Sequence, residues 1–133
     1  MQKCKYLEDI GLAITEYGTN FMSDDDKRSK DWALERTLYG FDNRETWNLN
    51  IIFIEWLYTR VLMYKEQASK RIDLSFHKIQ YHNEILSQIE VIDRILSLSK
   101  EILLDQKQDE LLFIEKSYEI CELWKEVLPY MWW

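Results

Sequence analysis

The sequence predicts a mainly α-helical bundle that forms a single domain over residues 1–133. A buried central helix is expected at about 43–66, and a small β-hairpin or extended arm at about 72–86. Three observations support this prediction. A chain of 133 residues fits one domain. Its three Gly and one Pro are too few for the frequent turns of an all-β fold. Apolar residues are densest around the predicted central helix.

The chain is acidic, with a formal net charge of −7 and a pI near 4.9. Such a charge repels a phosphate backbone, so direct nucleic-acid binding is not expected. It suits a basic groove on a protein partner, although solubility alone also explains it. Cys4 and Cys121 are predicted to be free buried thiols in a reducing compartment. No apolar stretch is long enough for a membrane span, so we expect the protein in the cytoplasm.

The first third of the chain is predicted to hold two short helices. Leu7, Ile10, Ile14 and Tyr17 follow helical spacing, so a helix is expected over about 3–17, ending near Gly18. A second helix is expected from about 24 to 38, after a capping box of Ser23 and Asp26, with Trp32, Ala33 and Leu38 facing inward. The run Asp24, Asp25 and Asp26 lacks the alternate spacing and the Gly of a calcium loop, so it is interpreted as a solvated surface that could meet a basic partner.

The central helix is expected to begin after Gly40, with Asp42 and Glu45 as a capping box. Thr46 is an alternative N-cap, and with it the helix would begin one turn later. Apolar residues cover nearly the whole circumference between Trp47 and Tyr64, which is typical of a helix buried on all sides.

The second half begins with alternating apolar residues between Ile72 and Leu86, which favour a hairpin around a turn at His82 and Asn83. A helix–loop with chance alternation is the alternative. Ser87 and Glu90 form a capping box for a helix at about 88–104. A last helix is expected at about 108–128, stopped by Pro129. Its predicted inward face consists of Leu111, Ile114, Tyr118, Cys121, Trp124 and Leu128, flanked by Phe113, Ile120 and Val127.

No motif for catalysis is recognised. There is no Gly-rich phosphate loop and no Cys-x-x-Cys, and the pair His77 and His82 lacks further zinc ligands. We therefore expect a non-enzymatic protein that needs no metal and no cofactor.

Three residues around the central helix are candidate ligand or partner contacts. Arg44 stands in the first turn of the helix, where it opposes the helix dipole. Either a carboxylate such as Asp42 or Glu45 holds it in a structural salt bridge, or it acts on a ligand. Arg60 has the same two interpretations, and Trp47 faces either the core or a ligand.

The chain ends with Trp132 and Trp133, which would form a costly apolar patch if left in water. They either fold back and close the core or form a contact surface for a partner.

The stretch Gly40-Phe-Asp-Asn-Arg-Glu-Thr-Trp-Asn-Leu-Asn50, together with Phe76-His-Lys78 and the aromatic C-terminus, resembles a family of small uncharacterised proteins encoded by bacteriophages and prophages. Asn50 stands where that family usually has Asp. The resemblance spans most of residues 39–133 and implies a context, a phage accessory protein in a bacterial cell, without implying catalytic residues.

The leading hypothesis is an accessory protein that binds and inhibits a host protein, such as a defence nuclease, by placing acidic side chains in a basic groove. One alternative is a binder that sequesters a nucleotide signal through a Trp and Arg44 or Arg60. Another alternative is a structural homo-oligomer, in which the aromatic residues form the subunit interface.

Overall fold

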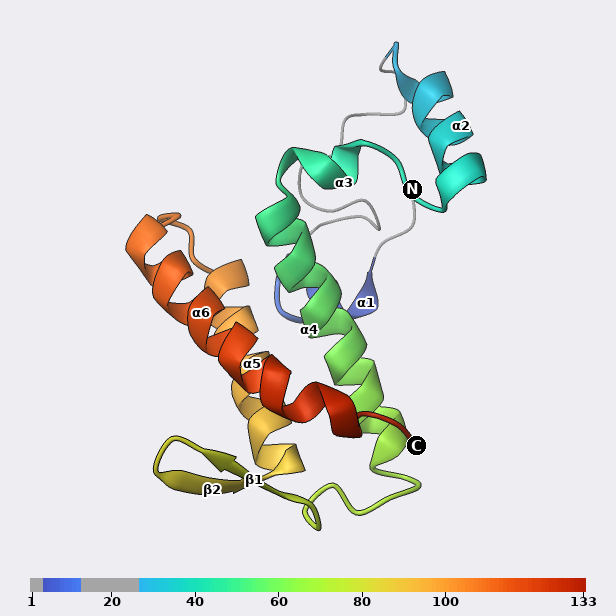
Figure 1. Cartoon of the computed structure of the whole chain (residues 1–133). Helices are drawn as coiled ribbons and strands as arrows, with labels where there is room; N and C mark the ends of the chain where they lie inside the picture. The colour runs from blue at the N-terminus through green and yellow to red at the C-terminus, as the bar shows by residue number, and fades with distance from the viewer. Residues whose placement is uncertain (1–3, 13–26) are drawn as a thin grey trace. The chain divides into compact units, whose positions relative to one another are not determined.

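The computed structural model describes residues 4–12 and 27–133, and the chain divides into two compact units, residues 1–56 and 57–133. The boundary lies within a helix, and the single domain stays a prediction. The fold class is confirmed, because 66% of the described residues are helical and they include one small antiparallel hairpin. The described elements are α1 (Lys5–Asp9), α2 (Ser29–Tyr39), α3 (Arg44–Trp47), α4 (Leu49–Ala68), β1 (Lys78–Tyr81), β2 (Glu84–Ser87), α5 (Gln88–Leu103), α6 (Glu110–Val127) and the 3-10 turn η1 (Leu128–Tyr130) (Figure 1).

In the first unit, α1 is shorter than predicted. It ends at Asp9, and Gly11 follows with a φ of 90°, a left-handed conformation that glycine adopts without strain. The predicted end of this helix near Gly18 lies outside the described residues. In α2 only Trp32 is buried, so the expected inward positions of Ala33 and Leu38 were wrong. Gly40, with a φ of 84°, ends α2 as the expected break.

The predicted central helix at about 43–66 is two helices, α3 and α4, because Asn48 leaves the helical conformation with φ −129° and ψ 63°. Asn side chains compete with the backbone for hydrogen bonds, and the Oδ1 of Asn50 accepts the N–H of Ile51 just after the break. The predicted capping box also differs, since the carboxylate of Asp42 binds Arg44.

Helix α4 is not buried on all sides, which corrects the second part of that prediction. Its buried positions include Ile54, Leu57 and Val61, whereas Phe53 and Trp56 are exposed. The apolar run was interpreted as complete burial, but large apolar side chains are common on protein surfaces.

The second unit is organised around α5 and α6, which pack against each other (Figure 1). The hairpin lies against both helices, because β2 contacts α5 and β1 contacts α6. Its register pairs Ile79 with Leu86, and both side chains are buried. The C-terminal half of α4 reaches α5 through an ion pair between Lys65 Nζ and Asp93 Oδ1 at 2.7 Å.

The hairpin is confirmed within the predicted region but is shorter, with strands only at 78–81 and 84–87. The alternation of Ile72, Leu74 and Phe76 forms no strand, and these residues lie in the loop before β1. Leu74 is buried whereas Ile72 and Phe76 are exposed, so only one of these three alternating side chains packs into the core. A loop can bury one apolar side chain without alternating like a strand.

Helix α5 begins as predicted. The Oγ of Ser87 accepts the N–H of Glu90 at 3.3 Å and donates to Glu90 Oε1 at 3.1 Å. A serine N-cap is a local signal that depends little on the rest of the fold, so the sequence predicts it well.

Ser99 in α5 is fully buried, and its Oγ has no hydrogen-bond partner among the residues that the structure describes. An unsatisfied buried hydroxyl is destabilising, and alanine has the higher helix propensity. We expect Ser99→Ala to raise the free energy of unfolding by about 1 kcal/mol in urea titrations. Ser97→Ala, an exposed position on the same helix, is the matched control and should gain less. A loss of stability in Ser99→Ala would contradict the assignment.

Helix α6 begins after Asp109, whose Oδ1 accepts the N–H groups of Leu111 and Leu112, and it ends before Pro129. Its main inward row was predicted wrongly, although Ile120 and Val127, which were expected to flank that row, are buried and Trp124 is half-buried. The buried residues are Ile120, Leu123 and Val127, whereas Leu111, Ile114, Tyr118, Cys121 and Leu128 are exposed. Both rows have helical spacing and similar hydrophobicity, so periodicity alone could not choose between them. The predicted burial of Cys121 is wrong for the same reason.

Candidate functional site

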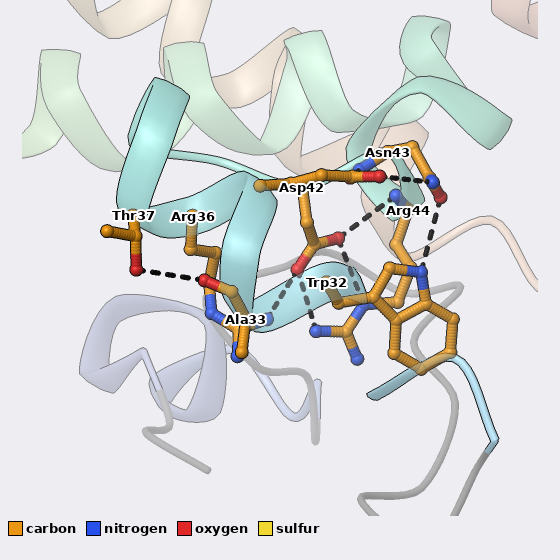
Figure 2. Close-up of polar contacts among 8 residues, drawn as sticks. Trp32, Ala33, Arg36, Thr37, Asp42, Asn43 and Arg44 are labelled. Carbon is orange, nitrogen blue, oxygen red and sulfur yellow. Dashed lines mark hydrogen bonds and ion pairs between the residues drawn. The ribbon is translucent and has the colours of Figure 1, made fainter. Parts of the chain in front are cut away.

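Arg44 lies in a buried polar network that joins the end of α2 to α3 (Figure 2). Its side chain is 2% exposed, and Asp42 beside it is also buried. Asp42 Oδ1 accepts the Nε of Arg44 at 3.0 Å, and Asp42 Oδ2 accepts Arg44 Nη2 at 2.8 Å and Arg36 Nη1 at 2.7 Å. The structural salt bridge from Arg44 to Asp42 is therefore confirmed, and a role of Arg44 toward a ligand stays a prediction.

The electrostatics of this network depend on the balance between burial and hydrogen bonding. Burial alone raises the pKa of the Asp42 carboxyl, but hydrogen bonds from Arg44 and Arg36 outweigh it and bring the pKa below its usual value. The guanidinium carbon of Arg44 also lies 4.2 Å from the centroid of the Trp32 ring. The network fixes the connection from α2 to α3.

Trp47 packs edge-on against Trp32, with ring centroids 6.0 Å apart, and remains partly exposed. The guanidinium of Arg28 lies 5.0 Å and 5.2 Å from the centroids of Trp32 and Trp47. Trp47 thus contributes both to packing and to the surface. Arg60, in the second unit, is exposed, and its Nη1 donates to Thr59 Oγ1 at 2.9 Å. Asp24, Asp25 and Asp26 lie outside the described residues.

The C-terminal tryptophans do not close the core, because the side chain of Trp132 is 73% exposed and that of Trp133 is also exposed. Their backbone is nevertheless anchored. Tyr64 Oη donates to the carbonyl of Trp132 at 3.4 Å, and Gln88 Nε2 donates to the carbonyl of Tyr130 at 3.1 Å. Of the two alternatives, the geometry favours a contact surface.

A double Trp132→Ala and Trp133→Ala variant tests this assignment. Because both side chains are exposed, we expect the free energy of unfolding to change by less than about 1 kcal/mol. Thermal melting of the full-length chain measures it, and collapse of the fold would show that the rings close the core. Val127→Ala, a fully buried position nearby, is the control that should destabilise by roughly 2 kcal/mol.

The solvent side of α6 carries two parallel rows of side chains, here called the α6 outer face. The apolar row consists of Leu111, Ile114, Tyr118 and Cys121, and Leu128 continues it at the start of η1. The acidic row consists of Glu115, Glu119, Glu122 and Glu126, which recur at the same helical spacing. The acidic row reaches the hairpin, because Tyr81 Oη donates to Glu122 Oε2 at 3.1 Å. Burial, and to a smaller extent this hydrogen bond, raises the pKa of Tyr81 to about 12.

Two adjoining clefts lie between the end of α4, the start of α5 and the C-terminus. The aromatic cleft has a volume of about 390 Å³ and is lined by Ile72, Asp73, Phe76, His77, Gln88, Tyr130 and Trp132. The basic cleft has a volume of about 610 Å³ and is lined by Ser69, Lys70, Arg71, Ile72, Asp73, Leu74, Ser75 and Ile89. Ile72 and Asp73 line both clefts. Of the predicted site residues that the structure describes, Trp132 lines the aromatic cleft, and the ring centroid of Trp133 lies 5.7 Å from the guanidinium carbon of Arg71 in the basic cleft.

Within residues 4–12 and 27–133, no cluster of three or more His, Cys, Asp or Glu side chains could hold a metal ion. In the same residues, no helix has the length and apolarity that crossing a membrane requires. Comparison with known proteins gave no match to a family model, a curated protein or a solved structure. The resemblance to small phage proteins therefore stays a prediction.

Sequence reasoning missed both surfaces for identifiable reasons. The α6 outer face was assigned to the core, although the carboxylates at positions 115, 119, 122 and 126 marked the adjoining side as solvent-facing. The basic cleft had a signal in Lys70 and Arg71, two adjacent basic residues in an acidic chain. The chain segments that complete the clefts are distant in sequence, so their meeting could not be predicted.

Proposed function

We propose that this chain is a non-enzymatic phage accessory protein that binds and inhibits a bacterial host protein through the α6 outer face. The observation that carries the proposal is the exposed apolar row beside the acidic row on one helix. Apolar side chains at a contact surface contribute affinity, while carboxylates around them select a basic partner and speed association. The phage context and the bacterial cytoplasm rest on the sequence resemblance.

The mechanism is steric and electrostatic. Tyr118, which is 68% exposed, is the anchor of the apolar row and would insert into a pocket of the partner. The acidic row would occupy a basic groove, such as the one with which a defence nuclease holds nucleic acid, and block it. No nucleic acid needs to touch the inhibitor itself.

A capture experiment with the full-length tagged chain tests the proposal. The bait is incubated with bacterial lysate at low salt, and bound proteins are identified by mass spectrometry. The variants are Ile114→Ser with Tyr118→Ser in the apolar row, and Glu115→Gln with Glu119→Gln in the acidic row. Ile85→Ser, on the exposed side of β2, is the matched control because Ile85 is 70% exposed.

The proposal predicts a basic protein that the wild type and the control retain and that both α6 variants lose. Purified, that protein should lose activity when the wild-type chain is added, and the association rate should fall as salt rises. Equal capture by all four chains, or an association rate that ignores salt, would contradict the proposal.

A second copy of this chain is the alternative partner for the α6 outer face, which would make the protein a homo-oligomer. Two copies meeting through α6 would bring their acidic rows close together, and like charges disfavour such contacts at low salt. Light scattering at two protein concentrations and low salt decides the question. A mass that doubles with concentration, and that Tyr118→Ser abolishes, would replace host-protein binding by self-association.

A further inference from the structure

The aromatic cleft offers exposed rings on an anchored backbone. Phe76 and Trp132 are both largely exposed, and the rings of His77 and Tyr130 have centroids 3.9 Å apart. Gln88 is buried and donates to the carbonyl of Tyr130 and to Tyr64 Oη, at 3.1 and 3.2 Å. Aromatic rings held in place by the backbone are a stacking platform for planar groups such as nucleobases.

The basic cleft concentrates positive charge in an acidic protein. Lys70 and Arg71 line it, and the pKa of Asp73 is lowered, first by hydrogen bonds from Ser75 and to a smaller extent by the charge of Lys78. None of these three basic side chains forms an ion pair with a residue in the described part of the chain, whereas Lys65, Arg94 and Lys116 do. Ile89 also lines this cleft, in the first turn of α5, and the N-terminal end of a helix carries partial positive charge. The ligand that suits this cleft is an anion.

Asp73 lies where the two clefts meet. Its Oδ1 accepts the N–H and the Oγ of Ser75, at 2.9 and 2.5 Å, which fixes the carboxylate. Its Oδ2 has no hydrogen-bond partner among the described residues. A fixed carboxylate with a free oxygen suits a sugar hydroxyl, which nucleotide-binding proteins commonly hold with Asp or Glu.

We propose that the two clefts form one binding site for a nucleoside phosphate. The base stacks on Phe76 and Trp132, the ribose hydroxyls donate to Asp73, and Lys70 and Arg71 hold the phosphate. The order of the three groups in a nucleotide matches the order of aromatic cleft, shared carboxylate and basic cleft. This site is independent of the α6 outer face. The arginine of this site is Arg71, whereas the sequence-based nucleotide hypothesis used Arg44 or Arg60; Arg44 is buried against Asp42, and Arg60 lines neither cleft.

Isothermal titration calorimetry on the full-length chain tests the site with three probes: AMP, adenosine and inorganic phosphate. We expect AMP to bind with a Kd between about 10 μM and 1 mM, and each of the two fragments to bind at least about tenfold more weakly. Arg71→Gln, Asp73→Asn and Trp132→Ala should each weaken AMP binding by roughly tenfold. Lys107→Gln, an exposed basic position in the turn before α6, is the control and should bind AMP like the wild type.

Three results would overturn the proposal. One is the absence of AMP binding up to about 5 mM, which lies beyond the weakest affinity expected of the site. Another is AMP binding that Arg71→Gln and Asp73→Asn leave unchanged although both variants melt like the wild type. The third is tighter binding of an oligothymidylate than of AMP, which would identify a single-stranded nucleic-acid surface instead.

Discussion

Replacing Asp42 by Asn should destabilise the first unit by about 3–5 kcal/mol, because it removes the carboxylate that pairs with the buried Arg44. Asn has the size of Asp and keeps one acceptor oxygen, so the loss of stability measures the contribution of the negative charge. Native-state hydrogen exchange of the α2 amides measures the effect, since Trp32 and Arg36 on α2 contact this network.

Two controls make this result specific. Asp9→Asn breaks the exposed ion pair with Lys5 and should cost no more than about 0.5 kcal/mol. The double variant Asp42→Asn and Arg44→Met should recover most of the loss, because a buried ion pair replaced as a whole is often neutral for stability. A single variant as stable as the wild type would contradict the account of the network.

The stabilisation by Asp42 should depend on pH in a definite direction. The pKa of Asp42 in the folded chain lies below its ordinary value of 3.8, so the unfolded chain binds a proton first as pH falls. The contribution of Asp42 is therefore complete above pH 3.8 and is lost as the pH falls through the folded pKa. The difference in free energy of unfolding between the wild type and Asp42→Asn should shrink over the same range of pH.

Replacing Glu55 by Gln should have the second largest effect, and it should stabilise the protein at neutral and alkaline pH. Glu55 is 5% exposed, and burial raises its pKa to about 7 from an ordinary value of 4.5. Between these values the folded chain holds a proton that the unfolded chain has lost, so stability falls as pH rises. Above pH 7 the accumulated loss is at most ~3 kcal/mol, which is the pKa difference converted to free energy.

Urea titrations of wild type and Glu55→Gln at acidic and alkaline pH check this prediction. The two chains should have similar stability below pH 4.5, and the variant should be more stable above pH 7. Glu66→Gln, an exposed position on the same helix, is the control and should follow the wild type at both values. A Glu55→Gln variant that is less stable than the wild type at alkaline pH would contradict the buried position of this carboxyl.

The sequence predicted best what local chemistry decides. The Ser87 N-cap, the stop before Pro129 and the salt bridge between Arg44 and Asp42 involve residues close in sequence, and all three are confirmed. Their geometry follows from capping and charge pairing, which need no knowledge of distant elements.

What the sequence could not decide depends on tertiary packing. Helix α6 has two apolar rows, and only its packing against α5 and β1 determines that Ile120 and Leu123 are buried while Leu111 and Tyr118 are exposed. Both candidate binding surfaces follow from such choices. The two clefts need Trp132 beside Phe76, residues far apart in the chain that meet only in the folded second unit.

The central claim, that the α6 outer face contacts a host protein, is tested most directly by photo-crosslinking in bacterial cells. The photoreactive residue p-benzoylphenylalanine replaces Tyr118 in one chain and Ile85 in another, two positions with exposed fractions of 68% and 70%. The account predicts a crosslink from position 118 to a basic host protein and none to that protein from position 85. No host crosslink at position 118, or the same crosslinks at both positions, would contradict it.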